Sequence, residues 1–271
     1  MINQVQERVE KFAGGETPEV RMTFGEHIEE LRGRLVKYIA FLIIAIIVSM
    51  VFYEELVTFI TGPHVDAMKM LKVPKAESRL MPGSYGGPIL AVMKLAFIVA
   101  LFVSSPFIGY QMWAFVSAGL YPKEKKYVVL FAPISFALFT VGCGFGFFIL
   151  VPYCLFGLAK SMSMGGILSN QYIFTDYLSL VMTLTIILGG VFQIPLIMVF
   201  VSKVGLVKPS SWNRWRRHAI VVNLIFAAIV TPADIFSMIM VAIPMLLLYE
   251  IGVVVSYLVA RPKKDAAPAK S

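Results

Sequence analysis

The chain has 271 residues, of which 58% are hydrophobic and only 15% are charged, and its mean hydropathy is +0.80. A soluble domain typically carries about 25% charged residues, so this composition excludes an ordinary soluble protein and indicates a multi-pass membrane protein. The net charge of +8 comes from basic residues at the ends of apolar runs, which argues against nucleic acid as a partner.

Patterns typical of catalysis are missing from the sequence. Cys143 and Cys154 lie on one apolar run, about 16 Å apart along a helix, which is too far for a disulfide. The histidines His27, His64 and His218 lack the spacing of a metal site, and no phosphate loop or nucleophile motif occurs. We therefore expect no enzyme activity, no metal and no cofactor.

The N-terminal part combines a polar tail with the first apolar run. Residues 1–25 lack the apolar core of a cleavable signal peptide, and we predict a mobile cytoplasmic tail. Segment 25–38 has apolar residues at helical spacing with charges between them. This pattern predicts an amphipathic lead-in at the membrane interface that continues into a first span at about 38–53.

Two further spans are predicted before the middle of the chain. The polar segment 54–87 is rich in Gly and Pro and predicts an ordered cap outside the membrane. The second span covers about 88–109 and is expected to break at Ser104-Ser105-Pro106. The third covers about 127–152 and contains small residues that let helices approach closely, namely Gly142, Gly144 and Gly146.

The stretch from Tyr110 to Lys126 links these two spans and has a different composition. Aromatic residues, a Ser-Ala-Gly bend and Pro122 lead into three lysines, which predicts a turn at the positive, cytoplasmic side. Glu124 lies among the lysines. A carboxylate in a basic loop could hold a cationic ligand, and a solvated loop charge is the alternative interpretation.

The fourth apolar run follows a second outer loop at about 153–172. It covers about 173–202 and is interrupted by polar and helix-breaking residues, among them Gln193 and Pro195, which predicts a tilt or a kink. The basic loop 203–217 follows, with tryptophans expected at interface depth.

The last two apolar runs are short. The fifth, 219–230, would reach about 18 Å, and the sixth, 235–249 before Glu250, about 22 Å, against a hydrocarbon core of about 30 Å. Either the bilayer thins locally around them or flanking side chains extend to the interface.

The distribution of Lys and Arg predicts the topology. Of the 24 basic residues, 18 lie in the segments 1–37 and 261–271 and in the loops 121–126 and 203–217. By the positive-inside rule, we predict an all-α polytopic protein with six transmembrane helices and both termini in the cytoplasm. The membrane domain would cover 26–260, followed by a cytoplasmic tail at 261–271.

Four motifs resemble those of the TatC family, the multi-pass core of the twin-arginine protein translocase, and the resemblance runs from about residue 23 to 258. They are HIEELRGRL at 27–35, SSPFIGYQMWAFVSAGLYPKEKK at 104–126, GGVFQIPL at 189–196 and VTPADIFSMIMVAIPMLLLYEIGVVVS at 230–256.

This resemblance implies a receptor in the plasma (inner) membrane for signal peptides with paired arginines, carried by folded cargo proteins. The family positions for signal-peptide binding correspond to Glu30, Arg32, Phe115, Tyr121 and Glu124. Two carboxylates suit this role, because each can accept a bidentate contact from a guanidinium.

The resemblance also implies partners. These are single-span proteins of the TatA/TatB type, membrane lipid and further copies of the chain in a larger complex, with transport driven by the proton-motive force. Gln193 stands where many family members carry Glu. Because a Gln side chain does not ionise, the role implied for it in the membrane is hydrogen bonding. Asp234 matches a position linked to translocation and partner contact, and a helix N-cap is its alternative role.

Two other classes of function are alternatives to this one. A small-solute or ion transporter would use Lys94, Gln193 and Asp234 along a polar path, but the sequence lacks the internal repeat typical of such proteins. A structural scaffold would fit the helix-packing glycines, but it would not need the acidic residues Glu30 and Glu124.

Overall fold

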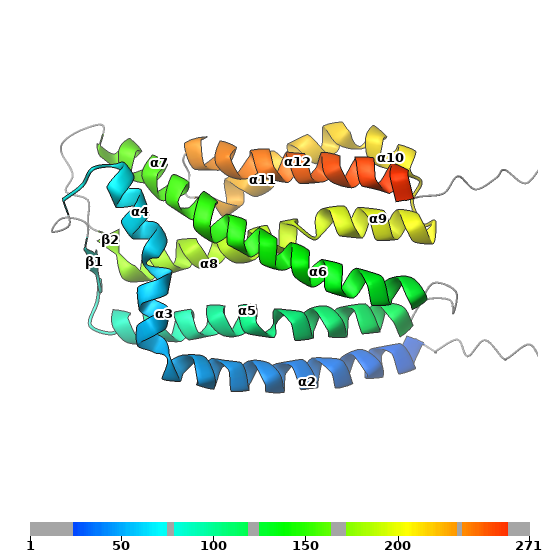
Figure 1. The fold of residues 1–271 in the computed structure, drawn as a ribbon, viewed down its shortest axis with the longest axis horizontal. Coiled ribbons are helices and arrows are strands. Elements are labelled where there is room, and N and C mark those ends of the chain that lie inside the picture. The colour runs from blue at the N-terminus through cyan, green and yellow to red at the C-terminus, as the bar shows by residue number, and fades with distance from the viewer. Residues whose placement is uncertain (1–23, 75–78, 119–124, 164–171, 232–234, 260–271) are drawn as a thin grey trace, which may run out of the picture.

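The computed structural model describes residues 24–74, 79–118, 125–163, 172–231 and 235–259. Long helices lie side by side in one bundle (Figure 1). Helix α2 (Phe24–Val51) begins at the end of the bundle where α12 (Ile235–Val259) finishes, and we call this the terminal end. The opposite end, the cap end, carries α3 (Tyr53–Ile60), α4 (Gly62–Met70) and the parallel strands β1 (Leu80–Met81) and β2 (Tyr172–Ile173).

The other helices run between or beside these ends. They are α5 (Gly87–Ala118), α6 (Lys125–Phe145), the π-helix η1 (Gly146–Leu150), α7 (Val151–Ser163), α8 (Phe174–Val191), α9 (Ile194–Val204), α10 (Pro209–Arg214) and α11 (Arg216–Val230).

Within the described ranges, five helical stretches are long and apolar enough to cross a membrane. They are Leu31–Val51, Gly87–Ser117, Leu130–Lys160, Phe174–Val204 and Ile235–Val259. The predicted fifth span lies in α11, whose 15 residues extend about 22 Å, so this helix is short as expected. The chain is therefore a helical membrane protein, while the count of six spans and the cytoplasmic placement of both termini stay predictions.

The prediction of a short sixth helix is wrong. Helix α12 has 25 residues, or about 37 Å, and it continues through Glu250. The carboxylate oxygen Oε2 of Glu250 lies 2.7 Å from Nη2 of Arg216 on α11, and both side chains are partly exposed. Because the charge is paired with a guanidinium on the neighbouring helix, it does not end the helix.

The predicted break in the second span is also absent, since α5 continues through Pro106 to Ala118. Proline has no N–H to offer the carbonyl four residues earlier, that of Phe102. The hydroxyl of Ser105 donates to this carbonyl instead, at 2.6 Å. The side chain thus replaces the missing backbone bond, and residues expected in a turn after Tyr110 belong to the helix.

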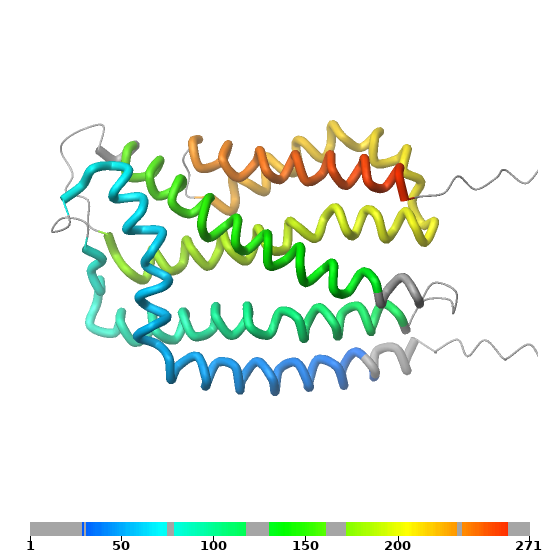
Figure 2. Tube along the Cα trace, in the orientation of Figure 1, coloured from blue at the N-terminus to red at the C-terminus, as the bar shows by residue number. Residues whose placement is uncertain are grey.

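The third span is longer than predicted. Helices α6 and α7 join through η1 into one continuous bent run that crosses the bundle obliquely (Figure 2), so the outer loop does not begin at 153. Two of the predicted small residues do allow close packing on α8. A Cβ at Gly142 would lie 2.8 Å from the carbonyl oxygen of Leu188, and one at Gly146 would lie 3.1 Å from Cα of Thr185.

Two other expectations concern helix continuity. The predicted interruption of the fourth span is confirmed, because α8 ends at Val191 and α9 begins at Ile194, with Pro195 in its first turn. The predicted continuation of the lead-in at 25–38 into the first span is confirmed, because both belong to the uninterrupted helix α2, while the position of the lead-in at the membrane interface stays a prediction.

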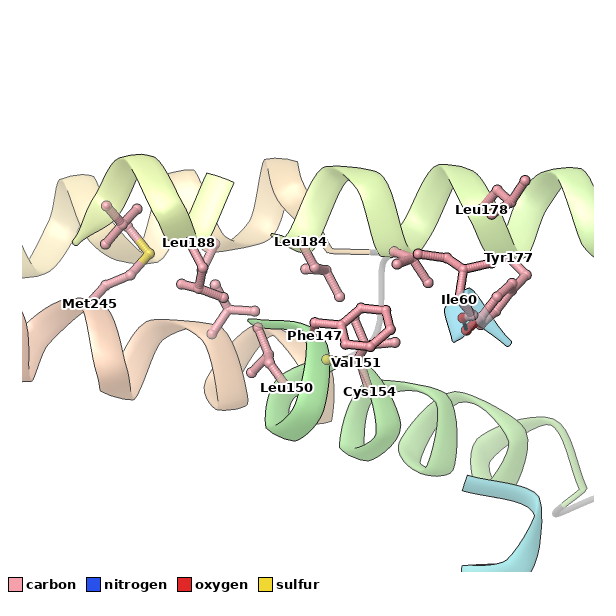
Figure 3. Packing of buried hydrophobic residues seen from close by; sticks show 14 of the residues in the cluster. Ile60, Phe147, Leu150, Val151, Cys154, Tyr177, Leu178, Leu184, Leu188 and Met245 are labelled. Atoms are coloured by element: carbon pink, nitrogen blue, oxygen red, sulfur yellow. Dashed lines mark hydrogen bonds between the residues drawn. The ribbon is translucent and has the colours of Figure 1, made fainter. Parts of the chain in front are cut away.

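The main core lies where α8 meets η1, α7 and α12 (Figure 3). Leu184 and Leu188 of α8 face Leu150 and Val151, and Met245 of α12 closes the cluster. All five side chains are almost fully buried. This packing holds together the half of the bundle that surrounds the bent third span.

The cap end is joined to this core by a buried aromatic cluster. His64 of α4 packs edge-to-face against Tyr172 and Tyr177, with ring centroids 5.1 Å and 5.6 Å away. The hydroxyl of Tyr177 donates to the carbonyl of Ile60 at the end of α3. The segment predicted as an ordered cap therefore forms helices and a strand that pack on the bundle.

Candidate functional site

Helices α2 and α5 pack along each other in opposite directions, and side-chain contacts fix their register. Near the terminal end, Nη1 of Arg34 donates to Oε1 of Gln111 at 3.1 Å. Further from that end, two turns along α2 and one turn along α5, the rings of Phe41 and Phe107 stack with centroids 5.1 Å apart. The two helices therefore arrive at the terminal end in a defined alignment.

This register brings three predicted site residues to one end of the bundle. Glu30 lies one turn before Arg34 on α2, and Phe115 lies one turn after Gln111 on α5, so their backbones are level. Arg32 is exposed and Phe115 is half-buried. We call the region of the terminal end where the backbones of Glu30, Arg32 and Phe115 lie the terminal-end surface. Tyr121, Glu124 and Asp234 lie outside the described residues.

An aromatic cluster supports the last turns of α5. The ring of Trp113 packs edge-to-face on Phe200 of α9, with centroids 4.9 Å apart, and lies 5.6 Å from Phe131 of α6. Phe131 and Phe200 also contact each other at 5.5 Å. Sequence reasoning missed this cluster, because its members are far apart in the chain and aromatic residues are common in membrane helices.

Polar contacts anchor α10 at the same end. The indole N–H of Trp212 donates to Oγ of Ser202 at 2.8 Å, and the hydroxyl of Tyr249 donates to the carbonyl of Trp212 at 2.7 Å. Nζ of Lys203 donates to the carbonyl of Val259 at 3.2 Å. The terminal end is therefore rich in basic and amphipathic side chains that are held in place by neighbouring helices.

An apolar groove of about 520 Å³ runs along the bundle between α2, α5, α6, α8 and α9. On α5 its wall extends from Ile98 to Val116, which is about 27 Å along the helix and close to the thickness of a hydrocarbon core. We call this feature the groove. Such a wall can take up an apolar chain or helix along most of the membrane depth.

Gln193 lies in the wall of the groove at the break between α8 and α9. It makes two hydrogen bonds with one residue of α6. The hydroxyl of Ser135 donates to Oε1 at 2.8 Å, and Nε2 donates to the backbone carbonyl of Ser135 at 3.0 Å. The sequence singled out Gln193 but missed Ser135, whose only signal is a hydroxyl within an otherwise apolar helix.

Lys94 lies on α5 one turn from Ile98, at the end of the groove nearest the cap. Its ammonium group donates to Oγ of Ser179 on α8 at 3.0 Å. This hydrogen bond links α5 to α8 at the end of the groove.

These features define a class of protein, a helical integral membrane protein with a charged surface at one end and a long apolar groove. The comparisons give the family. Residues 26–244 match the family model described as Sec-independent protein translocase protein (TatC).

Relatives and solved structures agree with this match. The chain is 32% identical to TatC of Halalkalibacterium halodurans, covering 89% of this chain and 91% of that protein. It is 31% identical to TatC of Escherichia coli K12, covering 84% and 85%. A crystal structure of the "Twin Arginine Translocase Receptor- TatC" superposes with a TM-score of 0.75 at 28% identity, covering 87% of this chain and all of that one.

The chain belongs to the TatC family of Sec-independent protein translocase proteins. The resemblance predicted from four motifs is confirmed. The protein is a membrane component of the Tat protein transport system.

Proposed function

We propose that this chain is the receptor subunit of a twin-arginine translocase in the plasma (inner) membrane, with both termini in the cytoplasm. It binds twin-arginine signal peptides through Glu30, Arg32 and Phe115, together with Tyr121 and Glu124. It assembles with TatA/TatB-type single-span proteins and further copies of itself, and it exports folded cargo at the expense of the proton-motive force.

The observation that carries this proposal is the register of α2 and α5. It brings the backbones of Glu30 and Phe115 level at the terminal end, the end that is rich in basic residues. A carboxylate surrounded by basic groups can select its ligand. The basic groups repel cations in general, and only a ligand with a well-placed guanidinium pair forms contacts strong enough to offset this repulsion. The similar crystal structure is that of a twin-arginine translocase receptor, which supports the same role.

The groove supports the proposed assembly with single-span partners. Its wall is apolar over a length close to the membrane core, and Gln193 provides a polar point within it. An amide can exchange one of its hydrogen bonds with a partner helix without any change in charge. We assign partner contact to Gln193, and also to Asp234, which follows the short helix α11 in the sequence.

Photo-crosslinking tests the receptor role. A photoreactive residue in place of Arg32 or Phe115 should crosslink to a paired-arginine peptide added to inverted membrane vesicles. The same residue in place of Tyr85, which is exposed near the cap end, serves as the control and should give no product. Crosslinks from Tyr85 alone would refute the proposed surface, and a scaffold or solute transporter would give no crosslinks from any of these positions.

Cysteine labelling tests the orientation separately. In a background without Cys143 and Cys154, cysteines at Ser78 and Ser169 should react with an impermeant reagent added from outside intact cells. Cysteines at Ser117 and Ser210 should stay unlabelled. The opposite pattern would place the terminal end outside and remove the basis for the receptor role.

A further inference from the structure

Lys94 continues the wall of the groove toward the cap end. On α5 the groove-lining residues Ile98, Leu101 and Phe102 follow Lys94 at helical spacing, so Lys94 lies on the same face one turn away. On α8 the partner of Lys94, Ser179, lies two turns before the groove residue Ile186. The pair therefore forms a polar rim where the apolar groove ends.

The ammonium group at this rim has unused hydrogen-bonding capacity. A lysine ammonium has three donors, and the described part of the chain accepts one of them, through Ser179 at 3.0 Å. The hydroxyl of Ser179 donates to the carbonyl of Thr175 at 2.8 Å, so its oxygen acts as the acceptor for Lys94. Among the described residues, the ion pairs are Lys69 with Asp66 and Arg216 with Glu250, and neither includes Lys94.

The depth of Lys94 matches that of lipid phosphates. The span Gly87–Ser117 has 31 residues, or about 46 Å, which exceeds a hydrocarbon core by about 16 Å. If the helix is upright and the excess is shared equally, about 8 Å lies beyond the core at each end. Lys94 is about 10 Å along the helix from Gly87, so its flexible side chain reaches the boundary with the headgroups.

We propose that Lys94 and the part of the groove next to it bind one anionic phospholipid of the leaflet at the cap end. The phosphate accepts hydrogen bonds from the ammonium group, and an acyl chain lies along Ile98 and Phe102. A single cation at the mouth of an apolar groove is complementary to a lipid, which joins an anion to an apolar chain. A free phosphate would use the cation but leave the groove unoccupied. This site does not depend on the proposed receptor function.

Native mass spectrometry of the purified full chain tests the site. The probes are phosphatidylglycerol and phosphatidylcholine with identical acyl chains, because they differ in net charge. The wild-type chain should retain phosphatidylglycerol more strongly, and Lys94→Gln should weaken that retention about fivefold, the effect of about one basic residue at a membrane surface. Lys94→Arg keeps the charge and should restore it.

Lys160→Gln is the matched control, since it removes a lysine from α7, outside the groove. It should leave lipid retention unchanged. Phosphatidylglycerol with eight-carbon chains should bind more weakly than the long-chain form if the acyl chain lies in the groove.

Three results would overturn the proposal. They are equal retention of both headgroups by the wild-type chain, equal losses in Lys94→Gln and Lys160→Gln, and displacement of the lipid by millimolar inorganic phosphate. Loss of a co-purified single-span protein from Lys94→Gln, with lipid retention intact, would assign the rim to a protein partner instead.

Discussion

The cap end and the terminal end of the bundle are built in opposite ways. At the cap end, His64, Tyr172 and Tyr177 pack together, with His64 and Tyr177 buried, and the Tyr177 hydroxyl is bound by the chain's own backbone. At the terminal end, Arg32 is exposed and many side chains are charged. The aromatic cluster at the cap end satisfies the Tyr177 hydroxyl internally, whereas the terminal end leaves the charge of Arg32 exposed to a ligand.

This difference separates stability from binding. Burial of aromatic area contributes several kcal/mol per side chain, while exposed charges contribute little to folding. Substitutions of the buried residues His64 and Tyr177 at the cap end should therefore lower the free energy of unfolding, and substitutions at the terminal-end surface should change ligand affinity.

The largest expected effect is that of Tyr177→Ala at the cap end. It removes a buried ring and its hydrogen bond to Ile60, so the free energy of unfolding should fall by about 3–5 kcal/mol. Thermal unfolding in detergent measures this loss. Tyr85→Ala makes the same chemical change at an exposed side chain and should cost almost nothing. Equal losses in both variants would contradict the role given to the cluster.

The second prediction concerns the terminal-end surface. Glu30→Gln should weaken binding of a paired-arginine peptide about tenfold or more, because a charge-assisted hydrogen bond is worth about 1.5–3 kcal/mol. Glu124→Gln should have a similar effect. Unfolding should stay unchanged in both variants.

Two controls accompany this measurement of peptide affinity. Glu29→Gln removes the same charge from an exposed position that points about 100° away on the helix, so it should scarcely matter. A peptide with lysines in place of its arginines should be insensitive to all three variants, since it lacks the bidentate geometry. Losses that are the same for both peptides would indicate a folding defect and contradict the proposed site.

Gln193→Leu probes the region between the two ends and should have a smaller effect. It removes both hydrogen bonds with Ser135, and intramembrane bonds of this kind contribute about 0.6–2 kcal/mol in total. Ser135→Ala removes only the hydroxyl donor and should cost less. Unfolding in detergent compares the two. A larger loss for Ser135→Ala would show that Gln193 is not the centre of this contact.

The smallest effect is expected for the ion pair between Arg216 and Glu250. Both side chains are partly exposed, so their coupling should be about 0.2–1 kcal/mol. A double-mutant cycle with Arg216→Gln and Glu250→Gln, followed by unfolding in detergent, measures it. A coupling of several kcal/mol would show that the terminal end also contributes strongly to folding.

The sequence predicted the helices better than their ends. Apolar runs and basic loops indicated the spans, and the interruption at Pro195 was confirmed because nearby polar and small residues favour a break. The same reasoning failed at Pro106, since it could not foresee that the Ser105 hydroxyl would satisfy the freed carbonyl. It failed at Glu250 because the partner, Arg216, lies on another helix.

The candidate site was predictable to a similar degree. The family motifs gave the residue types at Glu30, Arg32 and Phe115, but not the pairing of Arg34 with Gln111 that aligns their helices. Contacts of this kind join residues far apart in the chain and depend on the three-dimensional packing, so a single sequence does not specify them.

The π-helix η1 has a consequence for insertions and deletions. A π-turn holds about one residue more than an α-turn, and one residue corresponds to about 100° of rotation. The π-turn at Gly146–Leu150 therefore absorbs one residue, and a further residue inserted there, with nothing to absorb it, would rotate α7 by that angle relative to α6. Cys154 and Ala159 would then leave their buried positions. A gain of one codon should therefore be tolerated in the loops but not here, whereas the loss of one residue at the π-turn would leave a uniform α-helix with α7 in its present orientation.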